Sequence, residues 1–176
     1  MVQKKRDPLT AVKASASGLT GASGQTGDGY DGRVLIIEAR FYEDVAEELA
    51  AGAIAELEAN GVPFDRIAVP GALEIPQALS SAVPLFDDIY VGAIALGCVI
   101  RGETAHYDIV CNNANHWLME VAINSMIPVG NAILTVENME QALERARGGR
   151  AGKGGDAARA CLRLIEIERG FAERVA

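Results

Sequence analysis

The sequence has few cysteines and no uninterrupted apolar run of roughly 18 residues, the length that a membrane-spanning helix needs. Its three cysteines, Cys98, Cys111 and Cys161, form no CxxC pair. Neither a disulfide framework nor a zinc site is therefore expected, and the thiols should be reduced and buried. The basic N-terminus lacks the apolar core of a signal peptide. These absences predict a cytoplasmic protein.

Positive charge is also scarce, with 16 Lys and Arg against 24 Asp and Glu, which leaves a formal net charge of -8 at pH 7. Nucleic-acid binding requires clustered basic residues that neutralise phosphates. We therefore expect no general nucleic-acid surface. Any anionic ligand has to be bound by a local group of cations.

The 176 residues fit one domain, and a domain of this size buries roughly two thirds of the surface that its unfolded chain exposes. Residues 1–31 are rich in Gly, Ser, Thr and Ala and show no periodicity, so we expect a mostly disordered extension. A short extended piece just before Arg33 could order by pairing with the sheet edge of a neighbouring subunit. Residues 32–176 should form the folded domain.

From Arg33 onward, apolar runs alternate with helical patterns, which is typical of βαβ units around a parallel sheet. Four nearly apolar runs predict strands that are covered on both faces, at residues 33–38, 66–69, 89–98 and 131–135. The predicted fold class is α/β, a three-layer αβα sandwich of flavodoxin-like type. Its expected strand order is 2-1-3-4, because connections between parallel strands are right-handed.

Helical patterns fill the intervals between these runs. The first begins near Glu43 and ends by Gly61, and the second runs from about Glu74 to residues 82–83. The third is expected over residues 109–126. Its inward face is predicted to carry Val110, Ala114, Trp117, Val121 and Met126.

Two further helices are predicted after the fourth strand. Asn138 and Gln141 have the spacing of a capping box for a helix that runs through Arg145. Asp156 is expected to cap the last helix. That helix has one apolar stripe, made of Ala160, Leu164 and Ile167.

In an open parallel sheet, ligands bind outside the carboxyl ends of the strands. Phe41 follows the first predicted strand, and its ring either covers the first helix or serves as a platform for a flat ligand ring. Glu74 follows the second strand. Its carboxylate is either a partner of the helix dipole or part of a cleft beside the small residues Gly71 and Ala72.

The loop after the third strand contains Gly102, Glu103 and Thr104. Their successive N–H groups run toward a helix start, an arrangement that can hold a phosphate. His106 in the same loop is either structural or the proton carrier of the site, because imidazole exchanges protons near neutral pH. His116, within the third helix, is expected to be structural.

Four basic residues cluster in a Gly-rich stretch of this acidic chain, namely Arg145, Arg147, Arg150 and Lys153. A solvated loop is the ordinary explanation of such a charge run. The stretch is also the local cationic partner that an anionic substrate would need, because Arg binds phosphate oxygens through a forked pair of N–H donors.

Several motifs, in the same order along the chain, resemble those of the lumazine synthase family. They are RFYEDVA, VPGALEIP, GCVIRGETAHYDIV, and ILTVENMEQALERA followed by AGKGG, and the likeness spans residues 33–167. The resemblance implies a transferase of riboflavin biosynthesis that needs no metal and no redox cofactor. Its reaction would condense 5-amino-6-(D-ribitylamino)uracil with 3,4-dihydroxy-2-butanone 4-phosphate to 6,7-dimethyl-8-ribityllumazine, releasing phosphate and water.

The resemblance also implies roles for individual residues. Phe41 would stack on the pyrimidine ring. The ribityl chain and the ring orientation would depend on Ala72, Glu74 and Ile75. Backbone groups at the edge of the pyrimidine would come from Cys98, Val99 and Ile100.

By the same resemblance, the butanone phosphate would lie in a cradle made by Gly102, Glu103 and Thr104. Arg145 would supply the counter-charge and His106 would be the general acid and base. Lys153 matches a family lysine.

In this family the active sites form between adjacent subunits of a homopentamer, and twelve pentamers can close into an icosahedral shell. The short linker between Arg145 and Asp156 favours the shell, and riboflavin synthase is the implied protein partner. Two positions depart from the family pattern. Tyr42 replaces the Asn that often follows the stacking Phe, and Asn131 stands where many members place an aromatic residue that reaches into the neighbouring site.

Two other classes share the predicted fold, which alone does not determine function. A receiver domain needs an acidic pair after the first strand, and a flavodoxin needs a Ser/Thr-rich phosphate loop there. Ala39-Arg40 and Phe41-Tyr42 fit neither. A non-catalytic paralogue or shell protein that binds lumazine or riboflavin is the alternative function, and the presence of His106 with Arg145 favours the enzyme.

Overall fold

The computed structural model describes residues 32–86 and 88–175. The predicted extension, residues 1–31, lies outside the described residues, and so does the extended piece expected before Arg33. The division of the chain into an extension and a domain therefore stays a prediction.

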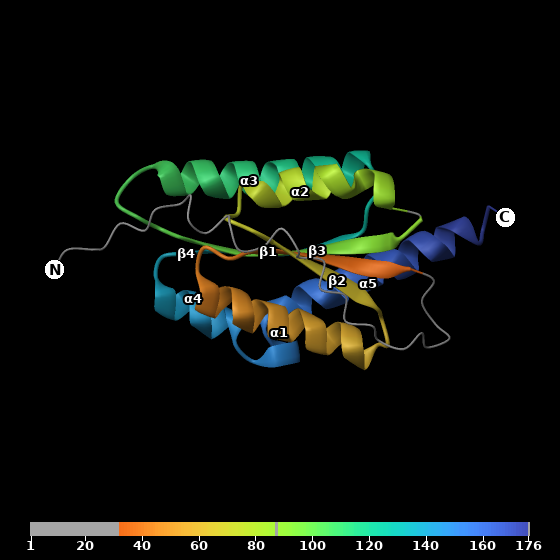
Figure 1. Cartoon of the computed structure of the whole chain (residues 1–176), viewed down its shortest axis with the longest axis horizontal. Coiled ribbons are helices and arrows are strands. Elements are labelled where there is room, and N and C mark those ends of the chain that lie inside the picture. The colour runs from red at the N-terminus through yellow and green to blue at the C-terminus, as the bar shows by residue number, and fades with distance from the viewer. Residues whose placement is uncertain (1–31, 87, 176) are drawn as a thin grey trace.

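Four parallel strands form the central sheet in the order β2-β1-β3-β4. They are β1 (Arg33–Ala39), β2 (Phe64–Val69), β3 (Tyr90–Ile100) and β4 (Val129–Val136). Helices cover both faces of this sheet, as Figure 1 shows. The predicted three-layer sandwich of flavodoxin-like type is thus confirmed.

The helices divide between the two faces of the sheet (Figure 1). One layer contains α1 (Glu43–Ala59), α4 (Met139–Ala146) and α5 (Lys153–Ala172), and the other contains α2 (Glu74–Ala82) and α3 (His106–Asn124). Two short 3-10 turns are η2 (Val83–Leu85) and η3 (Gly149–Ala151).

Each strand supplies side chains to two separate cores, because successive side chains point to opposite faces. On β1, Val34 and Ile36 belong to the core under α1, α4 and α5. Leu35 and Ile37 belong to the core under α2 and α3. Burial on both faces explains why the strands are nearly apolar throughout. Because all strand pairs are parallel, the four carboxyl ends lie at one edge of the sheet.

β2 begins two residues earlier than the apolar pattern predicts, because Asp65 interrupts that pattern. Asp65 is buried, and its carboxylate accepts hydrogen bonds from Arg33 Nε at 2.8 Å and from the Tyr90 hydroxyl at 3.1 Å. A buried carboxylate is tolerated in a strand when it is paired in this way. The register starts at Phe64, which pairs with Val34.

α3 differs from the prediction in two respects. It begins at His106 rather than at residue 109, so this histidine belongs to the first helical turn and not to the preceding loop. The prediction that Trp117 and Met126 face inward is wrong, because their exposed fractions are 52% and 80%. The buried side of the helix consists of smaller residues, Ala114, Leu118 and Ala122, which let it lie close to the sheet.

The last two helices confirm one predicted cap and contradict the other. Asn138 Oδ1 accepts a hydrogen bond from the N–H of Gln141 at 2.9 Å, as a capping box requires. Asp156 does not cap α5, because the helix begins at Lys153, and Asp156 lies within its first turn.

The apolar stripe predicted for α5 faces outward. Ala160, Leu164 and Ile167 are exposed in the isolated chain. A second stripe, offset along the helix, faces the core instead, with Ala157, Ala158, Cys161, Leu162 and Ile165. Both sides of α5 are therefore partly apolar, and periodicity alone does not tell which one is buried.

No helix between residues 32 and 175 combines the length and the apolar character that crossing a membrane requires. The three cysteines are unpaired thiols. Cys98 and Cys161 are buried and Cys111 is half-buried, which fits the expectation of reduced, interior cysteines.

Candidate active site

A cavity of about 270 Å³ opens at the carboxyl edge of the sheet, where ligands bind in folds of this kind. Its walls come from the segments that follow β1, β2 and β3. The lining residues are Phe41, Tyr42, Gly71, Ala72, Leu73, Glu74, Cys98, Val99, Ile100, Gly102, Thr104, His106, Tyr107 and Val110. Nine residues that the sequence assigned to the substrate site are among them.

Phe41 lies in the turn between β1 and α1 and is 71% exposed, so its ring does not cover the first helix. Its edge contacts the ring of Tyr42, with the two centroids 4.9 Å apart and the planes at 72°. Tyr42 is half-buried against the core of the α1 layer. The half-buried tyrosine thus supports an exposed aromatic face at the cavity wall, which suits stacking on a flat ring.

Glu74 is the first residue of α2, where the helix dipole stabilises a negative charge. A Cβ placed on Gly71 would come within 3.1 Å of Glu74 Oε2, so the carboxylate lies against a position without a side chain. Both residues line the cavity. Glu74 therefore shares the cavity with Phe41 and His106, and a carboxylate there can accept hydrogen bonds from ligand hydroxyl or N–H groups.

The turn from Gly102 to Thr104 leads into the N-terminus of α3. No acceptor among residues 32–86 and 88–175 receives the N–H groups of Gly102 and Glu103. A Cβ on Gly102 would meet nothing within 4 Å, so this side of the turn is open. Free N–H groups near a helix start are suited to an anion.

Arg101 does not line the cavity, but its contacts stabilise this turn. Its N–H donates to Val136 O at 2.9 Å, and its guanidinium lies 4.0 Å from the centroid of the Tyr107 ring. An ion pair with Glu137, at 3.0 Å, ties the same side chain to the end of β4. The turn and the first residues of α3 are thereby held against the sheet edge.

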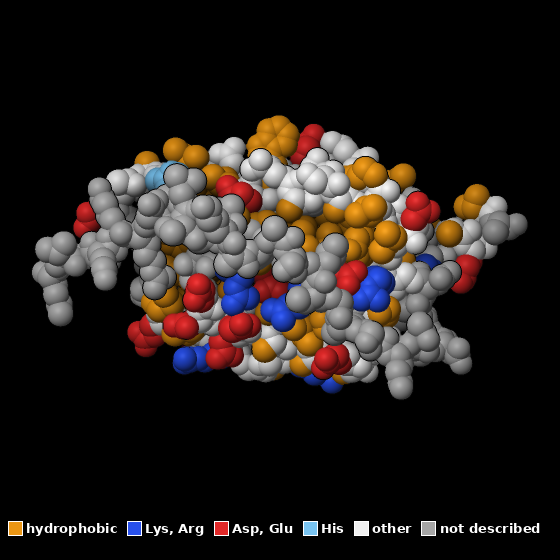
Figure 2. Space-filling view, viewed as in Figure 1, with side chains coloured by type: hydrophobic (Ala, Val, Ile, Leu, Met, Phe, Trp, Pro, Cys, Tyr) orange, Lys and Arg blue, Asp and Glu red, His pale blue; other side chains and the backbone are white. Residues whose placement is uncertain are grey.

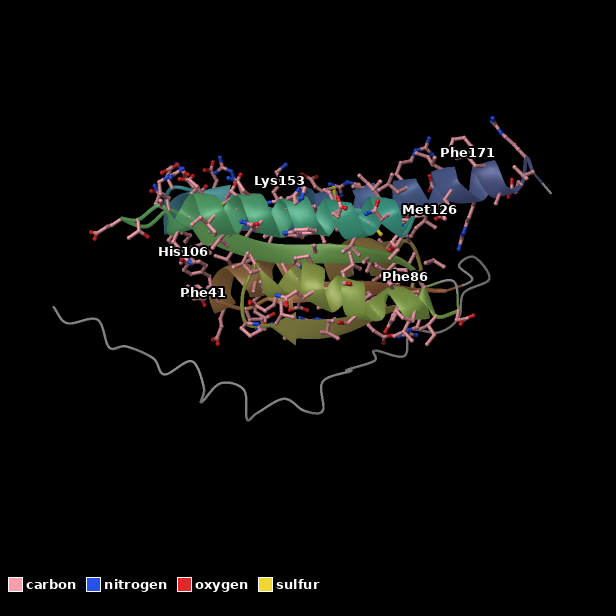
Figure 3. All side chains as sticks on the ribbon, turned by 90° about the horizontal axis from the view of Figure 1, so that it is seen from above. Phe41, Phe86, His106, Met126, Lys153 and Phe171 are labelled. Atoms are coloured by element: carbon pink, nitrogen blue, oxygen red, sulfur yellow. The ribbon has the colours of Figure 1, made fainter. Side chains whose placement is uncertain are left out.

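His106 stands at the first position of α3 with its side chain exposed at the cavity wall. Its backbone N–H lies 3.4 Å from Thr104 Oγ1, which closes the turn. Figure 3 shows Phe41 and His106 at the same end of the molecule. An aromatic ring and an imidazole therefore line the same cavity.

The thiol of Cys98 lines the cavity but is not a nucleophile at neutral pH. Burial, with a smaller contribution from the nearby Cys111, raises the pKa of the Cys98 thiol to about 11. Because the thiolate is the reactive form, a neutral Cys98 contributes an apolar surface and backbone groups. Burial also raises the pKa of the Tyr107 hydroxyl.

Two predicted residues lie next to the cavity without lining it. Ile75 has an exposed fraction of 0%, and its side chain belongs to the core under α2 and α3. Only the backbone groups of Ile75 can therefore contact a ligand in the cavity. Glu103 is exposed at the turn, but its side chain does not form part of the wall.

Three further predicted residues lie elsewhere on the chain. Arg145 and Lys153 line a separate depression at the end of α4 and the start of α5, together with Glu144, Arg147, Ala151 and Gly152. Figure 3 shows Lys153 apart from Phe41 and His106. Within one chain, the basic depression and the cavity share no lining residue.

Asn131 is exposed on β4, outside the cavity. Its Nδ2 donates to Asn115 Oδ1 at 2.7 Å, and its Oδ1 accepts from the N–H of Ile133 at 2.8 Å. The amide therefore has a defined orientation, and it retains one N–H and one oxygen lone pair for a further partner.

Five lining residues were not assigned to the site from the sequence. They are Tyr42, Gly71, Leu73, Tyr107 and Val110. Each of them is next to an assigned residue in the sequence or lies one helical turn from one. If a helix had been predicted to start at His106, its spacing would have placed Val110 one turn after the histidine, on the same side. In the part of the chain that the structure describes, no group of three His, Cys, Asp or Glu side chains is placed to hold a metal ion.

Comparison with known proteins identifies the family of this chain. Residues 31–169 match the family described as 6,7-dimethyl-8-ribityllumazine synthase. A protein of that name from Afipia carboxidovorans is 49% identical over 144 residues, which cover 80% of this chain and 88% of that protein. One from Methylorubrum populi is 47% identical over 172 residues, 96% of this chain and 95% of that protein. One from Azorhizobium caulinodans is 52% identical over 140 residues, 78% and 86% respectively.

The matched region includes every strand and helix that contributes to the cavity. This chain and its relatives are identical at about half of the aligned residues, over most of their lengths. The strand order is the predicted one, and one cavity contains Phe41, the Gly102 turn and His106. The chain belongs to the 6,7-dimethyl-8-ribityllumazine synthase family.

Proposed function

We propose that this protein condenses 5-amino-6-(D-ribitylamino)uracil with 3,4-dihydroxy-2-butanone 4-phosphate to 6,7-dimethyl-8-ribityllumazine, releasing phosphate and water. The reaction belongs to riboflavin biosynthesis and makes the protein a transferase. The observation that carries the proposal is the single cavity in which Phe41, the Gly102 turn and His106 meet.

The cavity offers separate surfaces to the two substrates. Phe41 stacks on the pyrimidine, while backbone groups of residues 98–100 contact its edge. Ala72, Glu74 and the backbone of Ile75 hold the ribityl chain, because the Glu74 carboxylate accepts hydrogen bonds from hydroxyl groups. The free N–H groups of the Gly102 turn, next to the exposed Thr104 hydroxyl, receive the phosphate of the second substrate.

The chemistry requires proton transfers and alignment more than a strong nucleophile. The amine nitrogen attacks the ketone carbon, and loss of water forms an imine. Inorganic phosphate is then eliminated, and ring closure releases a second water. His106 takes a proton from the attacking nitrogen and gives one to the departing oxygen. Alignment of the two substrates contributes up to about 7 to 11 kcal/mol.

The phosphate also needs a positive counter-charge, and no Lys or Arg lines the cavity among the residues that the structure describes. We assign this role to Arg145 from a neighbouring copy, with Lys153 beside it, because these two line an exposed basic depression of their own. Asn131 of the neighbouring copy contacts the pyrimidine. Its free donor and acceptor match the alternating N–H and carbonyl groups of a pyrimidinedione.

Membership of the family implies a homo-oligomer, and the surface of the chain supports one. α3 exposes the large apolar side chains of Ile109, Trp117 and Ile123, and Met126 is exposed just after the helix. Figure 2 shows further hydrophobic side chains between α2 and the sheet, whereas acidic and basic side chains are interspersed over the layer that contains α1. Contiguous apolar surface of this kind marks a contact site.

We propose a cytoplasmic homopentamer with active sites between adjacent subunits, and twelve such pentamers in an icosahedral shell. The short linker between Arg145 and Asp156 supports the shell. Riboflavin synthase, which uses the lumazine product, is the proposed protein partner.

The proposal is tested by incubating the purified protein with both substrates and following lumazine by its absorbance. Product formation well above the spontaneous background is expected. Tight lumazine binding without turnover would instead identify the non-catalytic paralogue, and neither outcome depends on the size of the assembly.

A further inference from the structure

Glu56 is one of three charged residues that are buried among residues 32–86 and 88–175. It lies in the fourth turn of α1, its side chain is 5% exposed, and it does not line the cavity. A carboxylate removed from water needs compensating partners. The two arginine partners of Glu56 lie on a different part of the chain, about a hundred residues away.

Two arginines and one asparagine satisfy this carboxylate. Arg150 Nε donates to Oε2 at 2.8 Å, and Arg159 Nη1 donates to the same oxygen at 2.9 Å. Asn60 Nδ2 donates to Oε1 at 3.1 Å. Hydrogen bonding from Arg150 is the main cause of a lowered pKa for Glu56, so the carboxylate is charged at neutral pH. One side chain of α1 therefore binds both η3 and α5.

The same hydrogen bonds continue to the basic depression. Arg159 Nη2 donates to Asp156 Oδ1 at 2.6 Å, and Lys153 Nζ donates to Asp156 Oδ2 at 2.7 Å. Lys153 lines the depression that also contains Arg145. An uninterrupted series of charged contacts thus connects buried Glu56 with an exposed lysine at the start of α5.

The backbone around η3 packs without intervening side chains. A Cβ on Gly52 of α1 would lie 2.6 Å from Gly149 O, and a Cβ on Gly152 would lie 2.6 Å from Ala146 O at the end of α4. The turn therefore contacts α1 on one side and the Arg145 end of α4 on the other. Glycine contacts set how close these backbones come, but they carry no directional bond. The directional bonds to the turn come from Glu56, which accepts from Arg150, and from Arg159, which is paired with Glu56 and donates to Arg150 O at 2.8 Å.

We propose that Glu56 is a positioning residue for the basic depression, holding residues 149–153 so that Lys153 and Arg145 present their charges together to a phosphate. Glu56 touches no substrate itself. This inference rests on the proposed function, in which the depression supplies the counter-charge for the butanone phosphate.

The test compares Glu56→Gln with Glu58→Gln in the full-length assembled protein. Glu58 lies two residues further along α1, is exposed, and makes no ion pair with the residues that the structure describes, so it controls for the loss of one negative charge. Steady-state rates are measured with each substrate varied in turn. Binding of inorganic phosphate is measured by calorimetry on the same samples.

For Glu56→Gln we expect the KM for the butanone phosphate to rise about ten-fold, because a charge-assisted hydrogen bond is lost. Phosphate affinity should fall by a similar factor. The kcat and the KM for the pyrimidine should change less than two-fold, and Glu56→Asp should restore part of the loss. An unchanged KM for the butanone phosphate in a folded, assembled Glu56→Gln protein overturns the inference.

A second variant keeps the test decisive if Glu56→Gln does not fold. Asp156→Asn removes the outer link of the series and leaves Glu56 paired with both arginines. It should raise the same KM, and an unchanged value would also overturn the inference. If the unmodified protein makes no lumazine at all, the proposed function fails instead, and phosphate binding alone then decides whether Glu56 organises the depression.

Discussion

Phe41 and His106 are both exposed in the isolated chain, although one is apolar and the other polar. The Phe41 ring contacts the half-buried Tyr42, and the backbone N–H of His106 donates to the Thr104 hydroxyl oxygen, which holds the residue at the start of α3. Folding therefore positions these side chains without burying them. This combination is what a binding site requires, because the side chains keep their contact surface for a ligand.

His106→Ala should lower turnover by roughly a hundred-fold to a thousand-fold, which lies within the usual contribution of a general acid and base. The alanine removes the only imidazole at the cavity and leaves the helix start intact. Single-turnover rates and light scattering measure chemistry and assembly separately. His116→Ala is the matched control, since His116 lies on the same helix away from the cavity. An unchanged rate for His106→Ala would remove its assigned role.

Arg145→Ala should chiefly weaken the use of the butanone phosphate, because a cation that faces a phosphate is lost. We expect a KM for that substrate raised about ten-fold or more, with little effect on pyrimidine affinity. Steady-state kinetics with each substrate varied provides the measurement. If only pyrimidine affinity changed, the two halves of the site would be assigned the wrong way round.

At the scale of elements, glycines decide how closely α5 approaches the rest of its layer. A Cβ on Gly154 would collide with the backbone oxygen of Leu49 in α1, whereas a Cβ on Gly170 of the same helix would meet nothing within 4 Å. The start of α5 is therefore packed backbone against backbone. Its far end is free to accept a side chain.

Gly154→Ala should destabilise the protein by about 1 to 3 kcal/mol, because α5 has to move away from α1 to admit the methyl group. Gly170→Ala should be neutral or stabilise by about 0.4 to 1 kcal/mol, since it reduces the freedom of the unfolded chain. Denaturant unfolding of both variants measures the difference. Equal stabilities would contradict the close contact between α1 and α5.

The tie between α1 and α5 through Glu56 should depend on pH. Hydrogen bonding from Arg150 lowers the pKa of Glu56 below its ordinary value of 4.5. A lowered pKa in the folded state means that the contribution to stability is complete above pH 4.5 and is lost as the pH falls below that value toward the folded-state pKa. Acid should therefore weaken the attachment of α5.

The free energy of unfolding, measured with urea between pH 6 and 3, should fall less steeply in Glu56→Gln than in the unmodified protein. At pH 7 the variant should be less stable by about 2 kcal/mol. This is less than a fully buried pair would lose, because both arginines reach solvent. Parallel curves for the two proteins would show that Glu56 does not titrate differently on folding.

At the scale of the whole molecule, one chain supplies an aromatic, a carboxylate and an imidazole at one edge and a basic depression elsewhere. These two features serve one reaction only if copies assemble so that the depression of one chain meets the cavity of the next. The exposed apolar side of α3 is the surface available for such a contact, since apolar side chains gain most from burial.

Ile123→Lys should reduce the size of the assembly, because it places a charge on that apolar side at a residue that is 73% exposed. Burying an unpaired lysine in an interface is costly. Light scattering of the variant and of Glu58→Lys, the same charge placed on α1, measures the effect. A native mass for Ile123→Lys would exclude this side of α3 as a contact.

The sequence by itself determined the features that depend on local chemistry. Four apolar runs predicted the strands, and the order 2-1-3-4 followed from the handedness of their connections. Asn138 and Gln141 predicted a cap that forms as expected. Phe41, Glu74 and His106 fell at strand ends, and parallel strands bring their carboxyl ends to one edge, so their meeting in a cavity was predictable.

Only the tertiary structure decided which side of each amphipathic helix is buried and where the basic residues lie. Trp117 and Leu164 fit an apolar pattern, yet both are exposed, because each helix turns another apolar side toward the sheet, with Leu118 on α3 and Ile165 on α5. Asp156 was predicted to cap α5, but the helix begins three residues earlier, at Lys153, and Asp156 pairs with Lys153 and Arg159 within it. Arg145 lies away from the cavity because it is in the last turn of α4, and the direction in which α4 leaves β4 is set by tertiary packing. No short-range sequence pattern predicts that direction.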